Sequence, residues 1–521
     1  MTEIIPSRAP VATDHAAPAA SRDTDAASHA LVRPGSATVA EQRATRTLLR
    51  GLAWQGGLRW LSQVVSWVVT LVVARRLTPD EYGVASLAAA FAVASGYVTE
   101  YGIGRAVVMQ RITRKATLGR LHAVSIATGL VLALLLCALA PVIARFWHEP
   151  RVTAPLLVWS LTFAFNGFMA VPSGRIQRRL AYRTIGTIEL GRGLAQGMVV
   201  LGVALAGGGY WALVAGYLTA SLLSALAYCG LAWVRPMWPA RHEMRALLAY
   251  PLHIVTGNMS WYGYSNADYL VAGRLLGLQA LGQYQFAWNI AQLPGDKLLN
   301  VLQGVTGPLF GSLGSTPGRV RSLLEQVVEL AALVIFPVVA GIGTVAPLVI
   351  PLLFGAKWLP AVAPMQLLLV NGALMTVSVL VTQALNASGR ARETGRLGLL
   401  LLLLMPPSFA VGARLAGIAG VATAWLVAQP LILGVPLREA RAAFGLRVRD
   451  VEHAIRPAVC GVGVMVASVL AVRAVLPGPP AWGALAIEVA VGAVVYVVTL
   501  ATLFPRRLRA TVHRWRDVRS A

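Results

Sequence analysis

Apolar stretches long enough to cross a bilayer follow one another along nearly the whole chain after residue 50. A membrane-spanning helix needs about 20 apolar residues, and only helices or closed barrels satisfy every backbone polar group inside hydrocarbon. Stretches of this length indicate helices, so we predict an all-α integral membrane protein with about 14 transmembrane helices. The predicted spans are 52–74, 83–104, 121–145, 153–172, 185–206, 210–233, 251–273, 281–304, 324–345, 360–386, 396–414, 417–436, 457–476 and 482–504.

The composition agrees with a membrane protein and argues against several other classes. The 521 residues are 57% hydrophobic and 13% charged, which is too apolar for a soluble domain. The net charge of +24 comes from arginines spread through short loops beside lipid headgroups, so we do not expect nucleic-acid binding. The three cysteines lie in apolar stretches without metal-ligand or redox spacing. Residues 1–45 are polar and Ala-rich and are predicted to be a disordered cytoplasmic tail, not a signal peptide.

The distribution of charge among the loops predicts how the helices are oriented. With a cytoplasmic N-terminus, the inner segments near helix ends hold 31 Lys and Arg residues, and the outer connections hold eight. Positive residues accumulate in the cytoplasmic loops of membrane proteins. We therefore expect both termini in the cytoplasm and the connections at 75–82, 274–280 and 477–481 in the periplasm.

An internal repeat predicts how the helices are grouped. At a constant offset of 199 residues, the stretch 71–77 (LVVARRL) aligns with 270–276 (LVAGRLL), and Gly83 aligns with Gly282. The alignment keeps its register with the predicted helix boundaries, which favours two pseudo-symmetric six-helix bundles in a parallel repeat around a central cavity. We assign the bundles to 46–240 and 241–440, and two additional helices with a basic cytoplasmic tail to 441–521.

Polar residues follow one face of the predicted eighth helix at spacings of three and four, and the first and seventh helices carry similar faces. Under the repeat, Arg59 aligns with Asn258 and Thr70 with Tyr269. Such faces are poorly suited to lipid, so we predict that they border one shared, water-filled cavity. The predicted cavity residues are Arg59, Ser62, Ser66, Thr70, Asn258, Tyr262, Ser265, Asp268, Gln285, Asn289, Gln292, Asp296, Lys297, Asn300 and Gln303.

Structural roles are the alternatives for these residues. Ser, Thr, Asn and Gln also join membrane helices through interhelical hydrogen bonds. Arg59 lies about 12 Å inside its helix and can extend to the cytoplasmic headgroups. Asp268 can pair with Arg274 near the outer interface. Asp296 and Lys297 are adjacent and cannot point in the same direction, and Lys297 is a candidate cation for binding an anion.

The sequence contains no arrangement of residues typical of an enzyme site. It has no metal-spaced His or Cys cluster, no Walker loop and no nucleophile elbow. The glycine run 207–209 is predicted to be a turn between apolar helices. We therefore expect no catalytic residues, no metal and no cofactor, and any transport would depend on gradients of substrate or ions.

Five short motifs, in order along the chain, resemble the polysaccharide transporter family. This family comprises the Wzx-type repeat-unit flippases of the multidrug/oligosaccharidyl-lipid/polysaccharide exporter superfamily. The resemblance covers about 45–440, and the first motif follows the first helix. The motifs are 74–83 (ARRLTPDEYG), 176–183 (IQRRLAYR), 210–214 (YWALV), 268–277 (DYLVAGRLLG) with 281–284 (LGQY), and 354–358 (FGAKW).

The resemblance implies two six-helix bundles around a central, largely cationic cavity that opens alternately to either side. The implied substrate is an undecaprenyl-diphosphate-linked oligosaccharide for exopolysaccharide or lipopolysaccharide synthesis. Its polyprenyl tail would stay among the membrane lipids. The implied location is the bacterial inner membrane, where other polysaccharide export machinery is a possible partner.

Two other functions fit parts of the same pattern. A drug or cation antiporter of the same superfamily would share the fold but would favour an acidic and aromatic cavity over one with Arg59 and Lys297. A polyprenyl-linked sugar polymerase or ligase would usually need a large outer loop. The longest outward connections here are about 10–20 residues, which argues against such an enzyme.

Overall fold

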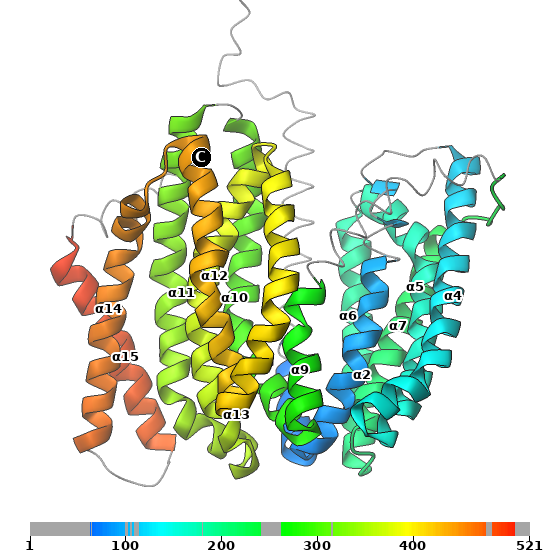
Figure 1. Cartoon of the computed structure of the whole chain (residues 1–521), viewed down its shortest axis with the longest axis horizontal. Helices are drawn as coiled ribbons and strands as arrows, with labels where there is room; N and C mark the ends of the chain where they lie inside the picture. Colours follow the sequence, from blue (N-terminus) through cyan, green and yellow to red (C-terminus); the bar gives the residue numbers. More distant parts are fainter. Residues whose placement is uncertain are drawn as a thin grey trace, which may run out of the picture. The chain divides into compact units, whose positions relative to one another are not determined.

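The computed structural model describes residues 63, 65–98, 103–104, 107–108, 114–179, 181–240, 262–313, 316–475 and 482–505. All the helices described below belong to one compact unit within Trp54–Ala521. The tail predicted at 1–45 therefore lies outside the described residues. Every regular element in the described ranges is helical, which confirms the all-α prediction (Figure 1).

The described helices fall on the predicted apolar spans. Nine of them are long and apolar enough to cross a membrane, so the chain is a multi-pass membrane protein, while the count of 14 spans stays a prediction. Besides the helical residues 65–76, the helices are α2 (Pro79–Val98), α4 (Lys115–Trp147), α5 (Thr153–Arg178), α6 (Tyr182–Leu205), α7 (Trp211–Ala232), α9 (Ala267–Leu276), α10 (Leu278–Leu313), α11 (Pro317–Phe354), α12 (Val362–Ala387), α13 (Ala391–Phe444), α14 (Val448–Val475) and α15 (Trp482–Leu503). Two 3₁₀ turns, η2 (Pro150–Val152) and η3 (Ala356–Ala361), precede α5 and α12.

The long element α13 is two helices folded back on each other. The backbone is non-helical at Ala416 and Gly417, and Gly417 has a φ of 57°, which a glycine adopts without steric cost. Gly412 and Gly420 then lie so close that a Cβ on Gly420 would come within 1.9 Å of the Gly412 carbonyl oxygen. This turn explains why the sequence predicts two spans, 396–414 and 417–436, where one element is found.

Helices α4, α5, α6 and α7 form one group, in which α5 packs against both α4 and α7 (Figure 1). Helix 65–76 belongs to the same group, because its end packs against α6 and α7. Gly129 and Gly167 let α4 and α5 approach closely, as small residues commonly do between membrane helices. Ser125 Oγ donates to the Gly167 carbonyl at 2.8 Å, and Trp159 Nε1 donates to the Val214 carbonyl at 3.0 Å. These bonds join the three helices without placing a charge between them.

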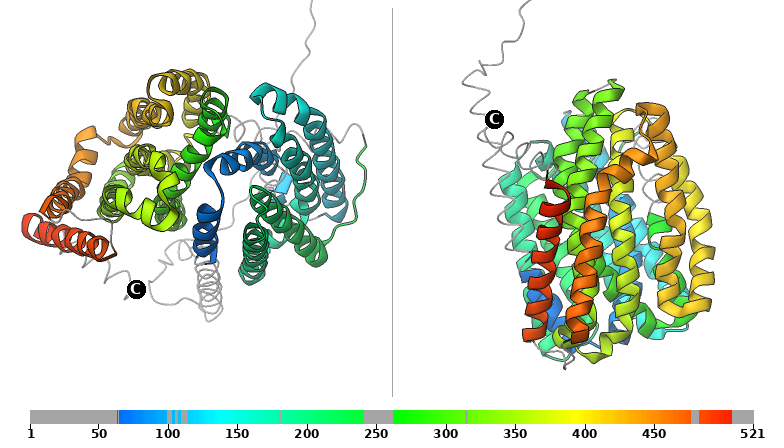
Figure 2. Two further views of the ribbon diagram at one scale, coloured as in Figure 1. Left: turned by 90° about the horizontal axis from the view of Figure 1, so that it is seen from below. Right: turned by 90° about the vertical axis from the view of Figure 1, so that its left-hand side faces the viewer.

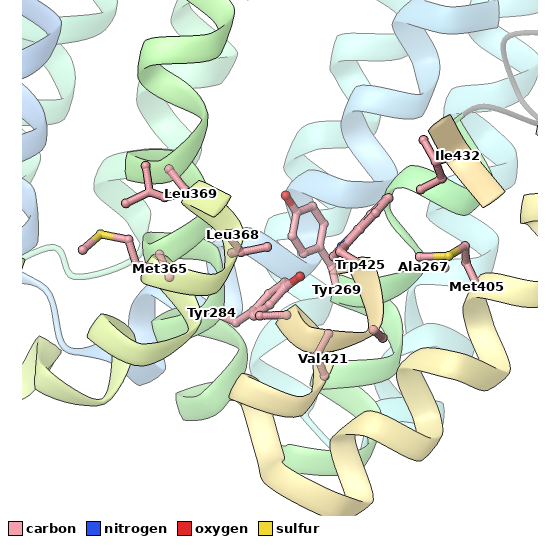
Figure 3. Packing of buried hydrophobic residues seen from close by; sticks show 14 of the residues in the cluster. Ala267, Tyr269, Tyr284, Met365, Leu368, Leu369, Met405, Val421, Trp425 and Ile432 are labelled. Carbon is pink, nitrogen blue, oxygen red and sulfur yellow. The ribbon is translucent and has the colours of Figure 1, made fainter. Parts of the chain in front are cut away.

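Helices α9 to α13 form a second group around a continuous apolar core (Figure 3). Its largest fully buried side chains include Trp358, Tyr284, Phe286 and Phe409. Residues of α2 belong to the same core, so the first part of the chain is packed directly onto the second. The predicted boundaries at 46, 241 and 441 stay predictions.

The last two helices, α14 and α15, pack beside α11 (Figures 1 and 2). Arg473 of α14 forms two hydrogen bonds, of 2.9 and 2.6 Å, with the carboxylate of Glu488 on α15. Its Nη2 also donates to the Thr344 carbonyl of α11 at 2.8 Å. Glu488 is only 3% exposed, and a buried carboxylate needs such a partner. One arginine thus connects both additional helices to α11.

Candidate functional site

Two cations join the two groups of helices at the end where helix 65–76 stops and α10 begins. Arg75 donates from Nε to the Leu353 carbonyl at 2.6 Å and from Nη2 to the Leu352 carbonyl at 3.1 Å. In return, Lys357 Nζ donates to the carbonyls of Arg75 at 2.8 Å and Leu77 at 2.6 Å. We call this reciprocal pair, Arg75 and Lys357, the latch.

Helix physics explains why cations are suited to these places. The last carbonyls of a helix have no partner within it and carry the negative end of the helix dipole. Helix 65–76 and α11 both end here, and each receives its cation from the other group. Trp358 adds a fifth bond, from Nε1 to the Ala74 carbonyl at 2.8 Å. All the acceptors in this contact are main-chain oxygens.

Two glycines allow the backbones to touch directly beside the latch. A Cβ on Gly83 would lie 1.9 Å from the Leu278 carbonyl oxygen, and one on Gly282 would lie 1.8 Å from the Pro79 carbonyl oxygen. Both distances are far below van der Waals contact, so only glycine fits in this arrangement. Gly83 and Gly282 are also aligned by the sequence repeat, and equivalent positions of α2 and α10 therefore meet each other.

The start of α2 at this end is fixed by local sequence. Glu81 accepts from the Thr78 backbone N–H at 2.8 Å, and the Glu81 backbone N–H donates to Thr78 Oγ1 at 3.2 Å. This reciprocal arrangement is a capping box, and Pro79 takes the first helical position, where no N–H is needed. The sequence 78–81 therefore begins α2 immediately after the latch.

Next to the latch lies a cavity of about 870 Å³ between helix 65–76, α2, the segment 262–269 and α10. This volume is within the usual range of small-molecule sites. Seven of its lining side chains are polar and uncharged: Gln63, Ser66, Thr70, Ser265, Asn266, Asn289 and Gln292. Seven are aromatic: Trp67, Tyr82, Tyr262, Tyr269, Phe286, Trp288 and Phe354. Among the described lining residues none is charged.

The polar groups of the cavity are held in place by neighbours. Asn289 Nδ2 donates to Tyr82 Oη at 2.8 Å, and Asn289 Oδ1 accepts from Gln285 Nε2 at 3.1 Å. Tyr262 donates from Oη to the Ala90 carbonyl of α2. The bonds to Tyr82 and to the Ala90 carbonyl cross between α2 and the second group of helices, so polar residues here both line the cavity and contribute to helix contacts.

Six of the predicted cavity residues line the cavity together. Gln285 is not in the lining but donates to Asn289, which is, and Gln303 lies farther along α10. The Gln303 carbonyl accepts from Gln383 Nε2 of α12 at 2.9 Å. The six that line the cavity are Ser66, Thr70, Tyr262, Ser265, Asn289 and Gln292. Outside the described part lie Arg59, Ser62 and Asn258, and the side chains of Asp296, Lys297 and Asn300.

The placement of Asp268 in the cavity is wrong for this structure, because the side chain is completely buried. Its carboxylate accepts from the Tyr269 backbone N–H at 2.9 Å, from Tyr284 Oη at 2.8 Å and from Trp425 Nε1 at 3.1 Å. The rings of Tyr269, Tyr284 and Trp425 lie close to one another in Figure 3. The alternative pairing with Arg274 is also wrong, since that guanidinium lies over the Phe146 ring, 5.3 Å from its centroid.

Apart from Tyr262, the polar pattern missed the aromatic residues of the lining, and it missed the latch. Trp67 follows Ser66, and Trp288 precedes Asn289, so the aromatic residues could have been found beside the polar ones. Arg75 and Lys357 both occur in the short motifs quoted above. Their carbonyl acceptors have no signature in the sequence. No group of His, Cys, Asp or Glu that could hold a metal occurs within the described ranges.

Comparison with known sequences identifies the family. The family described as "Polysaccharide biosynthesis protein" matches residues 72–363, more than half of the chain. The chain belongs to this family. The match includes α2, α10 and the latch, and it confirms the resemblance found in the motifs.

Individual relatives agree with this membership. The lipopolysaccharide biosynthesis protein WzxC of Escherichia coli K12 is 25% identical over 371 residues, which are 69% of this chain and 73% of WzxC. The succinoglycan biosynthesis transport protein ExoT of Rhizobium meliloti is 21% identical over 64% of this chain and 67% of ExoT. The teichuronic acid biosynthesis protein TuaB of Bacillus subtilis is 23% identical over 67% of this chain and 72% of TuaB.

Solved structures show the same fold. The lipid II flippase MurJ, in an inward closed conformation, has a TM-score of 0.70 at 11% identity and covers 87% of this chain and 99% of MurJ. An inward-facing multidrug transporter of the MATE family has a TM-score of 0.56 at 15% identity, over 74% of this chain and 94% of its own. ExoT and MurJ are named as a transport protein and a flippase. In line with the sequence prediction, this family member is a membrane transport protein of polysaccharide biosynthesis and not an enzyme.

Proposed function

We propose that the chain is a flippase for undecaprenyl-diphosphate-linked oligosaccharide repeat units. It would move them from the cytoplasmic to the periplasmic leaflet of the inner membrane by alternating access. The observation that carries the proposal is a cavity between two groups of helices that is bounded at one end by the latch and the paired glycines. Family membership supports a cargo from polysaccharide biosynthesis.

The polar residues of the cavity match the chemistry of the proposed substrate. Sugar hydroxyls and a diphosphate cannot cross hydrocarbon at useful rates without polar partners. The cavity offers amides and hydroxyls to the sugars, and the cations predicted at Arg59 and Lys297 would offer charge-assisted bonds to the diphosphate. The lipid tail can remain in the bilayer while the polar part passes between the helices.

Orientation can be tested by cysteine labelling in a background without Cys137, Cys229 and Cys460. Because the charge bias predicts a periplasmic latch, a cysteine at the exposed Arg76 should react with a membrane-impermeant thiol reagent added to whole cells whose outer membrane is permeabilised. A cysteine at Arg390 should react only after the inner membrane is broken. The reverse order of labelling would invert the proposed topology.

The function itself is tested by following the lipid-linked repeat unit. Arg59→Gln should lower polymer export while the repeat unit accumulates on the cytoplasmic leaflet and protein abundance stays normal. A partly desolvated charge-assisted contact contributes about 1.5–3 kcal/mol, or roughly ten- to hundredfold in affinity. Arg59→Lys should restore part of the export, because a point charge is enough where no bidentate fork is needed.

Arg392→Gln is the matched control, because this residue lies in the first turn of α13, at the end of the helix that is predicted to be cytoplasmic. It should export polymer at the wild-type rate. If Arg59→Gln also does so, without accumulation, then Arg59 is only an interfacial anchor and the cation must be sought at Lys297. If deletion of the whole chain leaves export and the repeat-unit pool unchanged, the flippase proposal is wrong.

A further inference from the structure

We infer that the cavity stretch beside the latch is a subsite for the glycan of the substrate and that the diphosphate is held farther from the latch. The inference rests on the proposed flippase function and adds to it the direction in which the cargo lies. It follows from the chemistry of the lining, from the order of residues along two helices and from the contacts that hold individual lining side chains in place.

The lining beside the latch is suited to sugars and unsuited to a diphosphate. Its described side chains are aromatic, aliphatic or neutral and polar, without a charge. An anion moved out of water needs cations or many donors, and arginine forks are the usual partners of phosphate. Sugar hydroxyls both donate and accept, which matches amides and hydroxyls. The C–H faces of a sugar ring pack well on the electron-rich faces of aromatic rings.

The latch cations do not make this lining more suitable for a diphosphate. Arg75 and Lys357 direct their donors to four main-chain carbonyls at 2.6 to 3.1 Å. Redirecting them to a ligand would leave helix-end carbonyls without partners. While the latch is closed, neither cation is therefore available to a phosphate in the cavity.

The order of residues along the chain puts positions 59 and 297 farther from the latch than the lining residues of the same two predicted spans. Helix 65–76 runs toward the latch, and α10 runs away from it. At about 1.5 Å per residue, position 297 lies roughly 7 Å farther from the latch than the lining residue Gln292. The sequence prediction of a span over 52–74 would put position 59 about 10 Å before Ser66, and residue 59 itself lies outside the described part of the chain. A diphosphate bound near positions 59 and 297 would leave its glycan pointing at the latch.

Two tryptophans, one from each group of helices, are the side chains best placed to hold a sugar ring. Trp67 is 45% exposed, and Trp288 borders the same cavity. The Trp288 ring is supported by Tyr269, at 5.9 Å between centroids, and by Trp425, at 5.5 Å. Asn289, next to it, is oriented by its bond to Tyr82. Side chains that neighbours already hold in place lose little conformational entropy when a sugar binds to them.

The test compares two probes on the purified full-length chain. One is the lipid-linked repeat unit extracted from a strain that lacks this chain, and the other is undecaprenyl diphosphate without a glycan. Trp67→Leu should weaken binding of the first probe roughly three- to tenfold and leave the second unchanged. Trp288→Leu should behave in the same way, and Trp288→Tyr, which keeps a ring, should lose less. Trp482→Leu, an exposed position on α15, is the control and should bind both probes normally.

Arg59→Gln should give a different pattern and weaken the binding of both probes equally, because both carry the diphosphate. Equal loss of both probes in Trp67→Leu, or no loss of either in a variant with a wild-type melting temperature, overturns the glycan subsite and leaves the flippase proposal standing. If the wild-type chain binds neither probe, the flippase proposal fails and the subsite fails with it.

Discussion

Gly83→Leu should abolish polymer export, because it prevents the helices from meeting beside the latch. Any side chain at this position begins with a Cβ 1.9 Å from the Leu278 carbonyl oxygen, and that oxygen belongs to backbone that cannot move aside alone. The closed arrangement is then sterically forbidden, while an arrangement with the helices apart is not. We therefore expect a protein that is locked open at this end and carries out no complete transport cycle.

The change can be measured by cysteine accessibility. In the cysteine-free background, a cysteine at Gln292 should be protected from an impermeant reagent applied at the latch side, and Gly83→Leu should make it reactive. Gly282→Leu should do the same, because its Cβ would meet the Pro79 carbonyl oxygen at 1.8 Å. Gly230→Leu is the matched control, since a Cβ added to this residue of α7 would have no neighbour within 4 Å. Normal export by Gly83→Leu or by Gly282→Leu would show that α2 and α10 never pack this closely during transport.

Replacing both latch cations should open the same end without a steric clash. Hydrogen bonds to charged groups contribute about 1.5–3 kcal/mol each, so losing even one net contact shifts the closed-to-open ratio by roughly tenfold or more. Arg75→Gln with Lys357→Gln should therefore raise labelling at Gln292 from the latch side and slow export. Arg75→Lys should restore part of the protection, because one ammonium can still reach a carbonyl.

Arg76→Gln is the control for this pair, since Arg76 is exposed on the same helical turn and is not part of the latch. It should label and export as the wild type does. Unchanged labelling in the double variant would mean that Trp358 and the glycine contact keep the end closed by themselves. The cations would then have no part in gating.

The helices could be predicted from the sequence, because their signal is local. A run of apolar residues is enough to locate a span, and the turn at Gly417 falls at a predicted boundary between two spans. The polar face of α10 was also predictable, since spacings of three and four place residues on one side of a helix. Asn289 and Gln292 accordingly border the cavity.

Contacts between distant segments could not be predicted in this way. The sequence suggests Arg274, six residues along the chain, as a partner for Asp268, but the indole that bonds to Asp268 belongs to Trp425, 157 residues away. Arg75 likewise reaches a carbonyl 278 residues away. Periodicity reports which residues share a face, and it does not report what that face meets. The sequence pattern did not indicate Trp67 and Trp288, because both also fit an ordinary apolar stretch.

The main-chain acceptors of the latch have a consequence for how such proteins can diverge. Leu352, Leu353 and Leu77 contribute only their carbonyl oxygens to Arg75 and Lys357. These bonds therefore do not depend on which side chains the three positions carry, and a change of side chain there needs no compensating change at Arg75 or Lys357. Methods that infer contacts from correlated substitutions are therefore not expected to detect these latch bonds. Constraints at such an interface appear as single invariant positions, with no partner position that changes along with them.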